Sequence, residues 1–123
     1  MNKVIMIGRT TKEVELKATQ SGTSVVEFSL AVKRTFKNAN GEYESDFFNC
    51  VAYKNTAELI GRYVKKGDMI GIDGKLQTRN YINREGNKVY VTEIIVENVE
   101  LLQAKKQDEP KFEEISPEDD IPF

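Results

Sequence analysis

Aromatic and basic side chains lie close together at three places in the sequence. Phe36 lies in KRTFK, Phe47 and Tyr53 lie in DFFNCVAYK, and Tyr81 follows Arg79 in LQTRNY. An exposed ring can stack on any nucleic-acid base, because every base has a π-face, and each such contact contributes about 1–3 kcal/mol. Nearby lysines and arginines can contact phosphates and release counterions, which makes binding salt-dependent. The pattern therefore predicts a surface for single-stranded nucleic acid, without the fixed donor and acceptor pairs of specific base readout.

The sequence lacks the residue types on which most enzyme chemistry depends. It contains no histidine and one cysteine, so neither a histidine acid–base pair nor a thiolate metal site can form. No phosphate-binding loop, nucleophile elbow or dinucleotide fingerprint occurs. We therefore expect a binding protein and not an enzyme, with no metal and no cofactor. Cys50 is predicted to be a small buried hydrophobe.

Five segments that carry or flank these rings are predicted to be β-strands. Residues 24–36 alternate apolar and polar side chains, which is the period-2 pattern of a half-buried strand. The other strands are predicted at 4–8, 46–53, 68–81 and 89–102. Turn-forming residues separate them, including Asn40-Gly41 between the second and third strands.

One helix is predicted between the third and fourth strands. Residues 55–67 carry apolar side chains at helical spacing, with Asn55 or Thr56 as its cap and Gly67 at its end. Five strands with a helix in this position follow the order of an OB-fold, an all-β, five-stranded Greek-key barrel that often binds oligonucleotides. Small sandwiches and other barrels share these signals, so the pattern alone leaves them open.

The fourth predicted strand contains two glycines. Gly71 and Gly74 indicate a bend or bulge, as the corner of a barrel requires. Ile70, Ile72 and Leu76 alternate with polar positions in this strand and are expected to share one face.

Adjacent phenylalanines in the third predicted strand cannot both face the core. Neighbouring strand residues point to opposite faces, so Phe47 and Tyr53 share one face and Phe48, Cys50 and Ala52 share the other. If the second set fills the barrel or a subunit contact, Phe47 and Tyr53 lie outside and are available for stacking.

The formal charge of −2 conceals two differently charged parts. Residues 1–103 hold 15 Lys and Arg against 13 Asp and Glu, whereas residues 104–123 hold 3 against 7. All three prolines lie in the second part. We expect a binding domain at 1–103 and a disordered acidic tail at 104–123.

No apolar run reaches the roughly 20 residues of a membrane helix, and the apolar run at the start is too short for a signal peptide, so a cytoplasmic location is expected.

Several segments resemble the bacterial and phage single-stranded DNA-binding proteins. They are NKVIMIGR, VEFSLAVKRTF, DFFNCVAYKNTAELIGRYVKKGDMIGIDGKLQTRNY and VYVTEIIVENVELL, with EDDIPF at the end. The resemblance runs from Asn2 to about Leu102, and GDMIGIDGKLQTRNY is its most specific piece. It implies an OB-fold that assembles as a homotetramer and wraps single-stranded DNA in replication, recombination and repair. In a phage-encoded member the location would be the host cytoplasm.

The resemblance also implies roles for individual residues. The stacking rings would be Phe36, Phe47, Tyr53 and Tyr81, and Phe48 would belong to a subunit contact. The best-known members often carry tryptophan at three of the ring positions, and this chain has none, so stacking per base is expected to be weaker. Arg34 and Arg79 are the favoured phosphate contacts. The full set of candidates is Lys3, Arg9, Arg34, Lys54, Lys66, Lys75, Arg79, Arg84 and Lys88.

The ending EDDIPF predicts a ligand for partner proteins. Phe123 can enter an apolar pocket while its carboxylate meets a basic side chain, and the preceding acids can steer it. The residues of this tip are Glu118, Asp119, Asp120, Ile121, Pro122 and Phe123.

Two other functions stay open, an RNA-binding OB module and a metal-dependent nuclease. The acidic tip disfavours the first, and scattered carboxylates disfavour the second.

Overall fold

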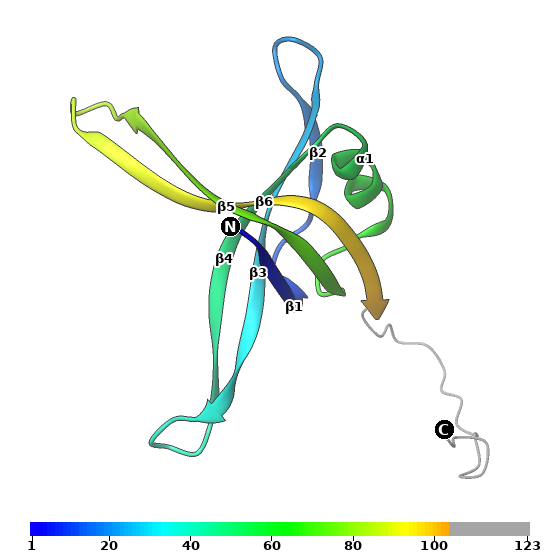
Figure 1. Ribbon diagram of the computed structural model, residues 1–123, viewed down its shortest axis with the longest axis vertical. Coiled ribbons are helices and arrows are strands. Elements are labelled where there is room, and N and C mark those ends of the chain that lie inside the picture. The colour runs from blue at the N-terminus through cyan, green and yellow to red at the C-terminus, as the bar shows by residue number, and fades with distance from the viewer. Residues whose placement is uncertain (104–123) are drawn as a thin grey trace.

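The computed structural model describes residues 1–103, and the acidic tail with its predicted tip lies outside the described residues. Figure 1 shows the order of the elements in this part of the chain. They are β1 (Val4–Thr10), β2 (Glu15–Ala18), β3 (Ser24–Lys37), β4 (Tyr43–Tyr53), α1 (Lys54–Tyr63), β5 (Met69–Ile82) and β6 (Lys88–Gln103). No helix within residues 1–103 is long and apolar enough to cross a membrane.

Five of the strands close into a barrel, which confirms the predicted OB-fold. The hydrogen-bonded order is β1-β5-β6-β4-β3, and β1 pairs with β3 to complete the ring. This closing contact joins Arg9 to Ala31 and Thr10 to Leu30. The sequence predicted that the first strand would end at Gly8, but β1 continues to Thr10. A Cβ at Gly8 would overlap the carbonyl oxygen of Ala31, so glycine permits the close approach of β1 and β3.

The strand β2 was missed from the sequence. It pairs with the first half of β3, from Glu15 opposite Glu27 to Ala18 opposite Ser24. All four of its residues are exposed, so it has no buried face to produce an apolar–polar alternation. Its hydrogen bonds to β3 define it as a strand, and Leu16 also lies against Gly61 of α1.

The barrel interior is filled by the alternating apolar residues of β3, β5 and β6. Leu30, Ile70 and Ile94 are fully buried, and Ile60 of α1 covers one end of the barrel. Cys50 is also buried, as predicted, and burial raises the pKa of its thiol to about 12. The thiol therefore stays protonated and serves as a small apolar side chain.

The predicted ends of the helix were wrong. α1 begins at Lys54, one residue after its N-cap Tyr53, and no side chain caps it. Thr56 donates its hydroxyl to the carbonyl of Glu97 on β6 instead. The helix stops at Tyr63, and Gly67, with φ +88°, turns the chain toward β5 four residues later.

A bulge is present at Gly74, as predicted, but its extra residue, Glu97, lies in the partner strand β6. The pairing of β5 with β6 shifts between Asp73 and Gly74, where a Cβ would overlap the carbonyl oxygen of Ile95. Ile70 and Ile72 lie in the core before the bulge. Leu76 lies after it and is exposed, because there β5 has left the barrel as one side of a hairpin.

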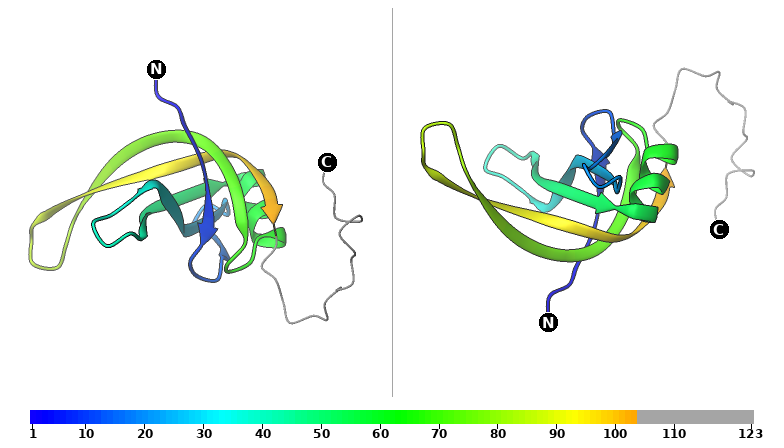
Figure 2. Two further views of the ribbon diagram at one scale, coloured as in Figure 1. Left: turned by 90° about the horizontal axis from the view of Figure 1, so that it is seen from below. Right: turned by 90° about the horizontal axis from the view of Figure 1, so that it is seen from above.

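Two hairpins extend beyond the barrel. The β3–β4 and β5–β6 tips both project away from the end that α1 covers, and the β5–β6 hairpin arches across β3 and β4 (Figure 2). Exposed side chains on these hairpins are therefore held on long strands whose roots belong to the rigid barrel.

Candidate nucleic-acid interface

The β3–β4 ladder presents two of the predicted rings on one face. Phe47 pairs with Ala31, and Tyr53 pairs with Val25, so both project to the side opposite the core. Their exposed fractions are 66% and 42%, which confirms that they lie outside the barrel. Phe48 packs against the core from the opposite face, also as predicted. Its role in a subunit contact stays a prediction.

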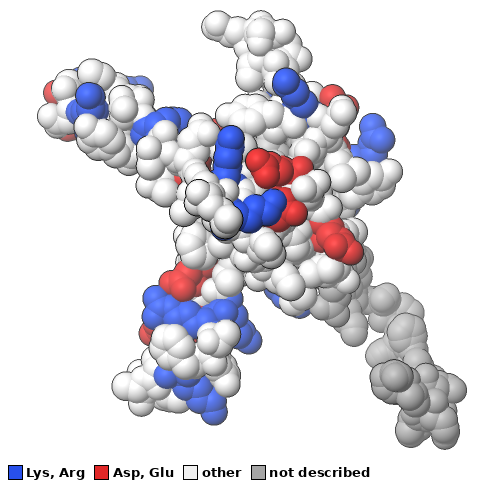
Figure 3. Space-filling model, in the orientation of Figure 1, with Lys and Arg blue, Asp and Glu red and all other residues white. Residues whose placement is uncertain are grey.

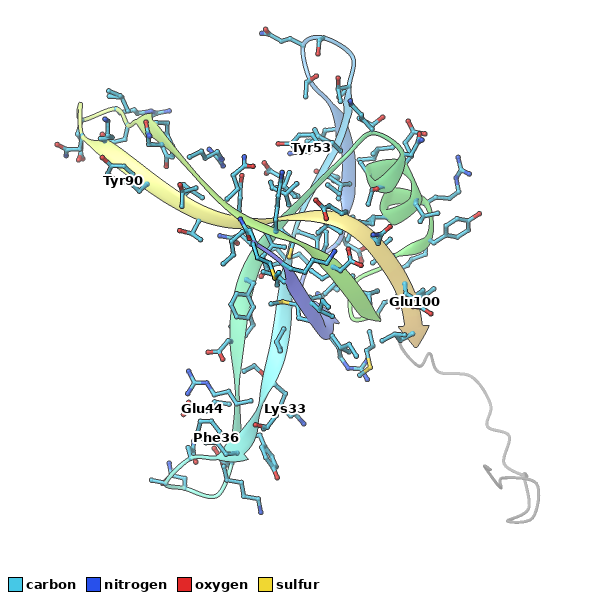
Figure 4. The ribbon with its side chains drawn as sticks, in the orientation of Figure 1. Lys33, Phe36, Glu44, Tyr53, Tyr90 and Glu100 are labelled. Atoms are coloured by element: carbon cyan, nitrogen blue, oxygen red, sulfur yellow. The ribbon has the colours of Figure 1, made fainter. Side chains whose placement is uncertain are left out.

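The other two predicted rings lie near the tips of the hairpins. Phe36 is exposed close to the end of β3, and Tyr81 is exposed close to the end of β5, where it pairs with Val89. Figure 4 shows Phe36 at the far end of the β3–β4 hairpin and Tyr53 near the barrel. Phe36 and Tyr81 thus lie on the two hairpins, here called the β3–β4 arm and the β5–β6 arm. Phe47 and Tyr53 lie further along β4, so the four rings do not form one compact cluster.

A cleft lies between the two arms, close to the barrel. Its volume is about 360 Å³. Its lining comes from the β1–β2 loop and from β3, β4, β5 and β6: Lys12, Glu13, Glu27, Phe28, Ser29, Asn49, Cys50, Val51, Arg79, Val91 and Glu93. Asn49 and Val51 occupy the face of β4 that also carries Phe47 and Tyr53, so the cleft continues the surface of the rings.

Arg79 is held in this cleft by a buried carboxylate. Its Nε donates to Oε2 of Glu93 at 3.2 Å, and the side chain of Glu93 is only 4% exposed. The hydrogen bond to Glu93 and then its charge raise the pKa of Arg79, and Glu27 and Tyr53 contribute further. The sequence reasoning selected Arg79 but missed Glu93, whose position opposite Gln77 beside Arg79 depends on the β5–β6 register.

Arg34 projects from the other face of the β3–β4 hairpin. It alternates with Lys33, whose partner Ser45 lies on the face of Phe47. Its guanidinium donates from Nη2 to Oδ1 of Asp46 at 2.8 Å and from Nη1 to Oε1 of Glu44 at 3.2 Å. The hydrogen bond from Arg34 lowers the pKa of Asp46, and that same bond raises the pKa of Arg34. A phosphate at Arg34 would have to compete with two carboxylates.

Other cations of this hairpin were not selected from the sequence. Lys33 and Lys37 each place Nζ over the ring of Tyr43, at 5.6 and 5.8 Å from its centroid. The basic side chains of the hairpin are prominent in Figure 3, next to acidic ones at its root. The alternation of Lys33 with Arg34 could have shown that these two cations serve opposite faces.

The remaining predicted phosphate contacts are dispersed. Lys3 is ion-paired with Asp73 at 3.4 Å and Glu97 at 3.8 Å, beside an apolar surface away from the rings. Arg9 donates to the carbonyl of Gly67 at 3.0 Å and lines a second cavity with Lys33. The others are placed as follows: Lys54 directly after Tyr53, Lys66 in the α1–β5 loop, Lys75 just past the bulge, Arg84 in the β5–β6 turn and Lys88 at the start of β6.

The comparison with known families decides which kind of OB-fold this is. The model of the single-strand binding protein family matches residues 1–102. The chain belongs to this family. The match ends where the described barrel ends, so it covers both arms and the cleft between them.

Individual members of the single-strand binding protein family are closely similar. Single-stranded DNA-binding protein 1 of Staphylococcus aureus (strain MSSA476) is 49% identical over 109 residues, which are 89% of this chain and 70% of the relative. Single-stranded DNA-binding protein 2 of Listeria monocytogenes (serovar 1/2a) is 49% identical over 105 residues, 85% of this chain and 66% of the relative. A solved structure, the Plasmodium falciparum SSB complex with ssDNA, superposes with a TM-score of 0.74 at 30% identity, covering 84% of this chain and 96% of that chain.

Tyr90 is a further exposed ring that was not selected from the sequence, as are Tyr43 and Tyr63. Tyr90 on β6 is exposed, with Nζ of Lys88 5.9 Å from its ring centroid, and Figure 4 shows it on the β5–β6 arm. It pairs with Asn80, one position away from the pair formed by Tyr81 and Val89, so the two tyrosines project from opposite faces of the arm. Tyr81 therefore shares the face of Arg79, whereas Tyr90 lies on the opposite face of the β5–β6 arm.

Proposed function

We propose that this chain binds and coats single-stranded DNA without strong sequence preference, in replication, recombination and repair. The observation that carries the proposal is the pair of exposed rings, Phe47 and Tyr53, on the face of β4 that continues into the Arg79 cleft. Exposed rings along a surface with lysine and arginine suit bases that stack and phosphates that pass nearby. Membership of the single-strand binding protein family and the relatives' printed names support it.

The test is the binding of fluorescently labelled oligo(dT), measured by anisotropy at increasing salt. We expect tight binding at low salt, an affinity that falls linearly with salt on logarithmic axes, and weak binding of a duplex of equal length. An unlabelled oligo(U) competitor separates DNA from RNA as the preferred strand. No binding of oligo(dT) at low salt would reject the proposal.

The proposal includes assembly into a homotetramer, which an exposed apolar surface supports. Ile5 and Ile7 of β1 and Leu101 and Leu102 of β6 are all about half exposed or more, and three of them border a cavity of about 260 Å³ with Gly71. Contiguous exposed apolar side chains of this kind are typical of protein–protein contacts. Sedimentation with and without oligo(dT) measures the subunit number and the site size together.

The proposal also assigns partner recruitment to the last residues of the chain. Deleting Ile121 to Phe123 is expected to leave oligo(dT) affinity nearly unchanged, because the predicted stacking rings lie in β3, β4 and β5. The same deletion is expected to abolish recruitment of partner proteins, because it removes the apolar side chain and the terminal carboxylate that a partner would capture. The measurement is capture of proteins from a bacterial extract on DNA-bound chain, with identification by mass spectrometry.

A matched control for this deletion removes three tail residues and keeps the tip. Deleting Gln107 to Glu109 shortens the tail equally. We expect this variant to recruit the same proteins as the intact chain. Equal recruitment by the tip-deleted and intact chains would show that the tip has no such role.

A further inference from the structure

The cleft beside Arg79 lies between the two exposed rings of β4. Along the β3–β4 ladder the outward pairs are, in order, Ala31 with Phe47, Ser29 with Asn49, Glu27 with Val51, and Val25 with Tyr53. Phe47 and Tyr53 are six residues apart, or roughly 20 Å at the rise of a β-strand. A strand of DNA that stacks on both rings must therefore pass over the polar side chains between them.

The charges of the cleft favour base edges over phosphates. Glu13, Glu27 and Glu93 line it, against the two cations Lys12 and Arg79. One of these cations, Arg79, is already bonded to Glu93. A phosphate entering the cleft would meet an excess of negative charge, whereas the donor groups of a base would meet acceptors.

Glu27 is the carboxylate of the cleft that lies on the β3–β4 ladder between the two rings, opposite Val51. Its side chain is exposed, and within residues 1–103 no hydrogen bond or ion pair reaches its carboxylate. Its direct cross-strand neighbour on β2 is Glu15, and like charges in such a pair are destabilising. Arg79 interacts with Glu27 through charge, and its hydrogen bond goes to Glu93 instead.

We propose that Glu27 reads an amino group on a base in this cleft and gives the chain a local preference for cytosine over thymine. A carboxylate accepts from the N4 amino group of cytosine, and the same position in thymine is the O4 acceptor, which a carboxylate repels. Asn49 can turn its amide to either base and so does not discriminate. The preference rests on the proposed single-stranded DNA binding and is superimposed on stacking that is indifferent to sequence.

The test compares the affinities of short oligo(dC) and oligo(dT) of one length, for the intact chain and for Glu27→Gln. Glutamine keeps the size of the side chain, removes the repulsion from Glu15 and can donate to O4 of thymine, so the fold is retained. We expect the ratio of oligo(dC) to oligo(dT) affinity to fall about fivefold in Glu27→Gln, the low end of the discrimination seen for such contacts. Differences in stacking between the two bases cancel, because they are the same in both proteins.

A matched control is Glu85→Gln, in the β5–β6 turn outside the cleft. It removes the same charge, so both variants are expected to bind every strand somewhat more tightly, but only Glu27→Gln is expected to change the ratio. If Glu27→Gln still bound both strands with an unchanged ratio of oligo(dC) to oligo(dT) affinity, the proposed role of Glu27 would be overturned and the proposed DNA binding would stand. Failure of the intact chain to bind either strand would instead reject the proposed function.

Discussion

Replacing Phe47 with alanine is expected to weaken oligo(dT) binding by about fivefold to about 150-fold, without loss of folding. The ring is 66% exposed, so it contributes little to the core, and the loss of one base stack costs about 1–3 kcal/mol. The factor follows because about 1.4 kcal/mol is tenfold in affinity. Anisotropy of labelled oligo(dT) at fixed salt measures the affinity, and thermal unfolding checks the fold.

The control for this change is Tyr63→Ala. Tyr63 is the last residue of α1 and is 55% exposed, so it is a ring of similar exposure. Figure 2 shows α1 at the end of the barrel away from the tips of the two hairpins. It is expected to leave the affinity unchanged. If the two variants lost affinity equally, or if Phe47→Ala lost none, stacking on the outer face of β4 would be the wrong description of the site.

Replacing Gly74 with alanine is expected to destabilise the chain by about 3 kcal/mol, at the upper end of the usual cost of overpacking. The new Cβ would overlap the carbonyl oxygen of Ile95, which is backbone of the neighbouring strand and cannot turn away as a side chain could. The bulge at Asp73 and Gly74 would have to open, and with it the point at which β5 leaves the barrel. Urea unfolding followed by circular dichroism measures the free energy of unfolding.

Gly71 in the same strand provides the comparison for Gly74. A Cβ at Gly71 would meet only Leu102 and Ile7 side-chain carbons, at 3.6 and 3.7 Å, which is ordinary contact. Gly71→Ala is therefore expected to change the free energy of unfolding little. Equal stability of both variants would mean that β5 and β6 are not held as close together at Gly74 and Ile95 as the structure shows.

The sequence predicted those features that depend on local periodicity. The alternation in β3 and β4 placed Leu30 and Cys50 inside and Phe47 outside, because each side chain of a strand faces opposite to its neighbours. Gly74 indicated the bulge because a strand glycine is common where backbones approach closely. β2 escaped prediction because none of its residues is buried, and the helix start at Lys54 escaped because no side chain caps it.

By itself the sequence determined most of the strands and which rings would be exposed, since these follow from side-chain type and spacing along one strand. The choice of the OB-fold over other small barrels came from the family resemblance. Only the tertiary structure decided which charges share a surface. Arg34 and Arg79 each precede an aromatic residue by two positions in the sequence. Arg34 is bonded to Asp46 on the far face of its hairpin, whereas Arg79 is bonded to buried Glu93 in the cleft. The partners come from the registers of β3 with β4 and of β5 with β6, and a register between distant strands is set by packing of the whole barrel.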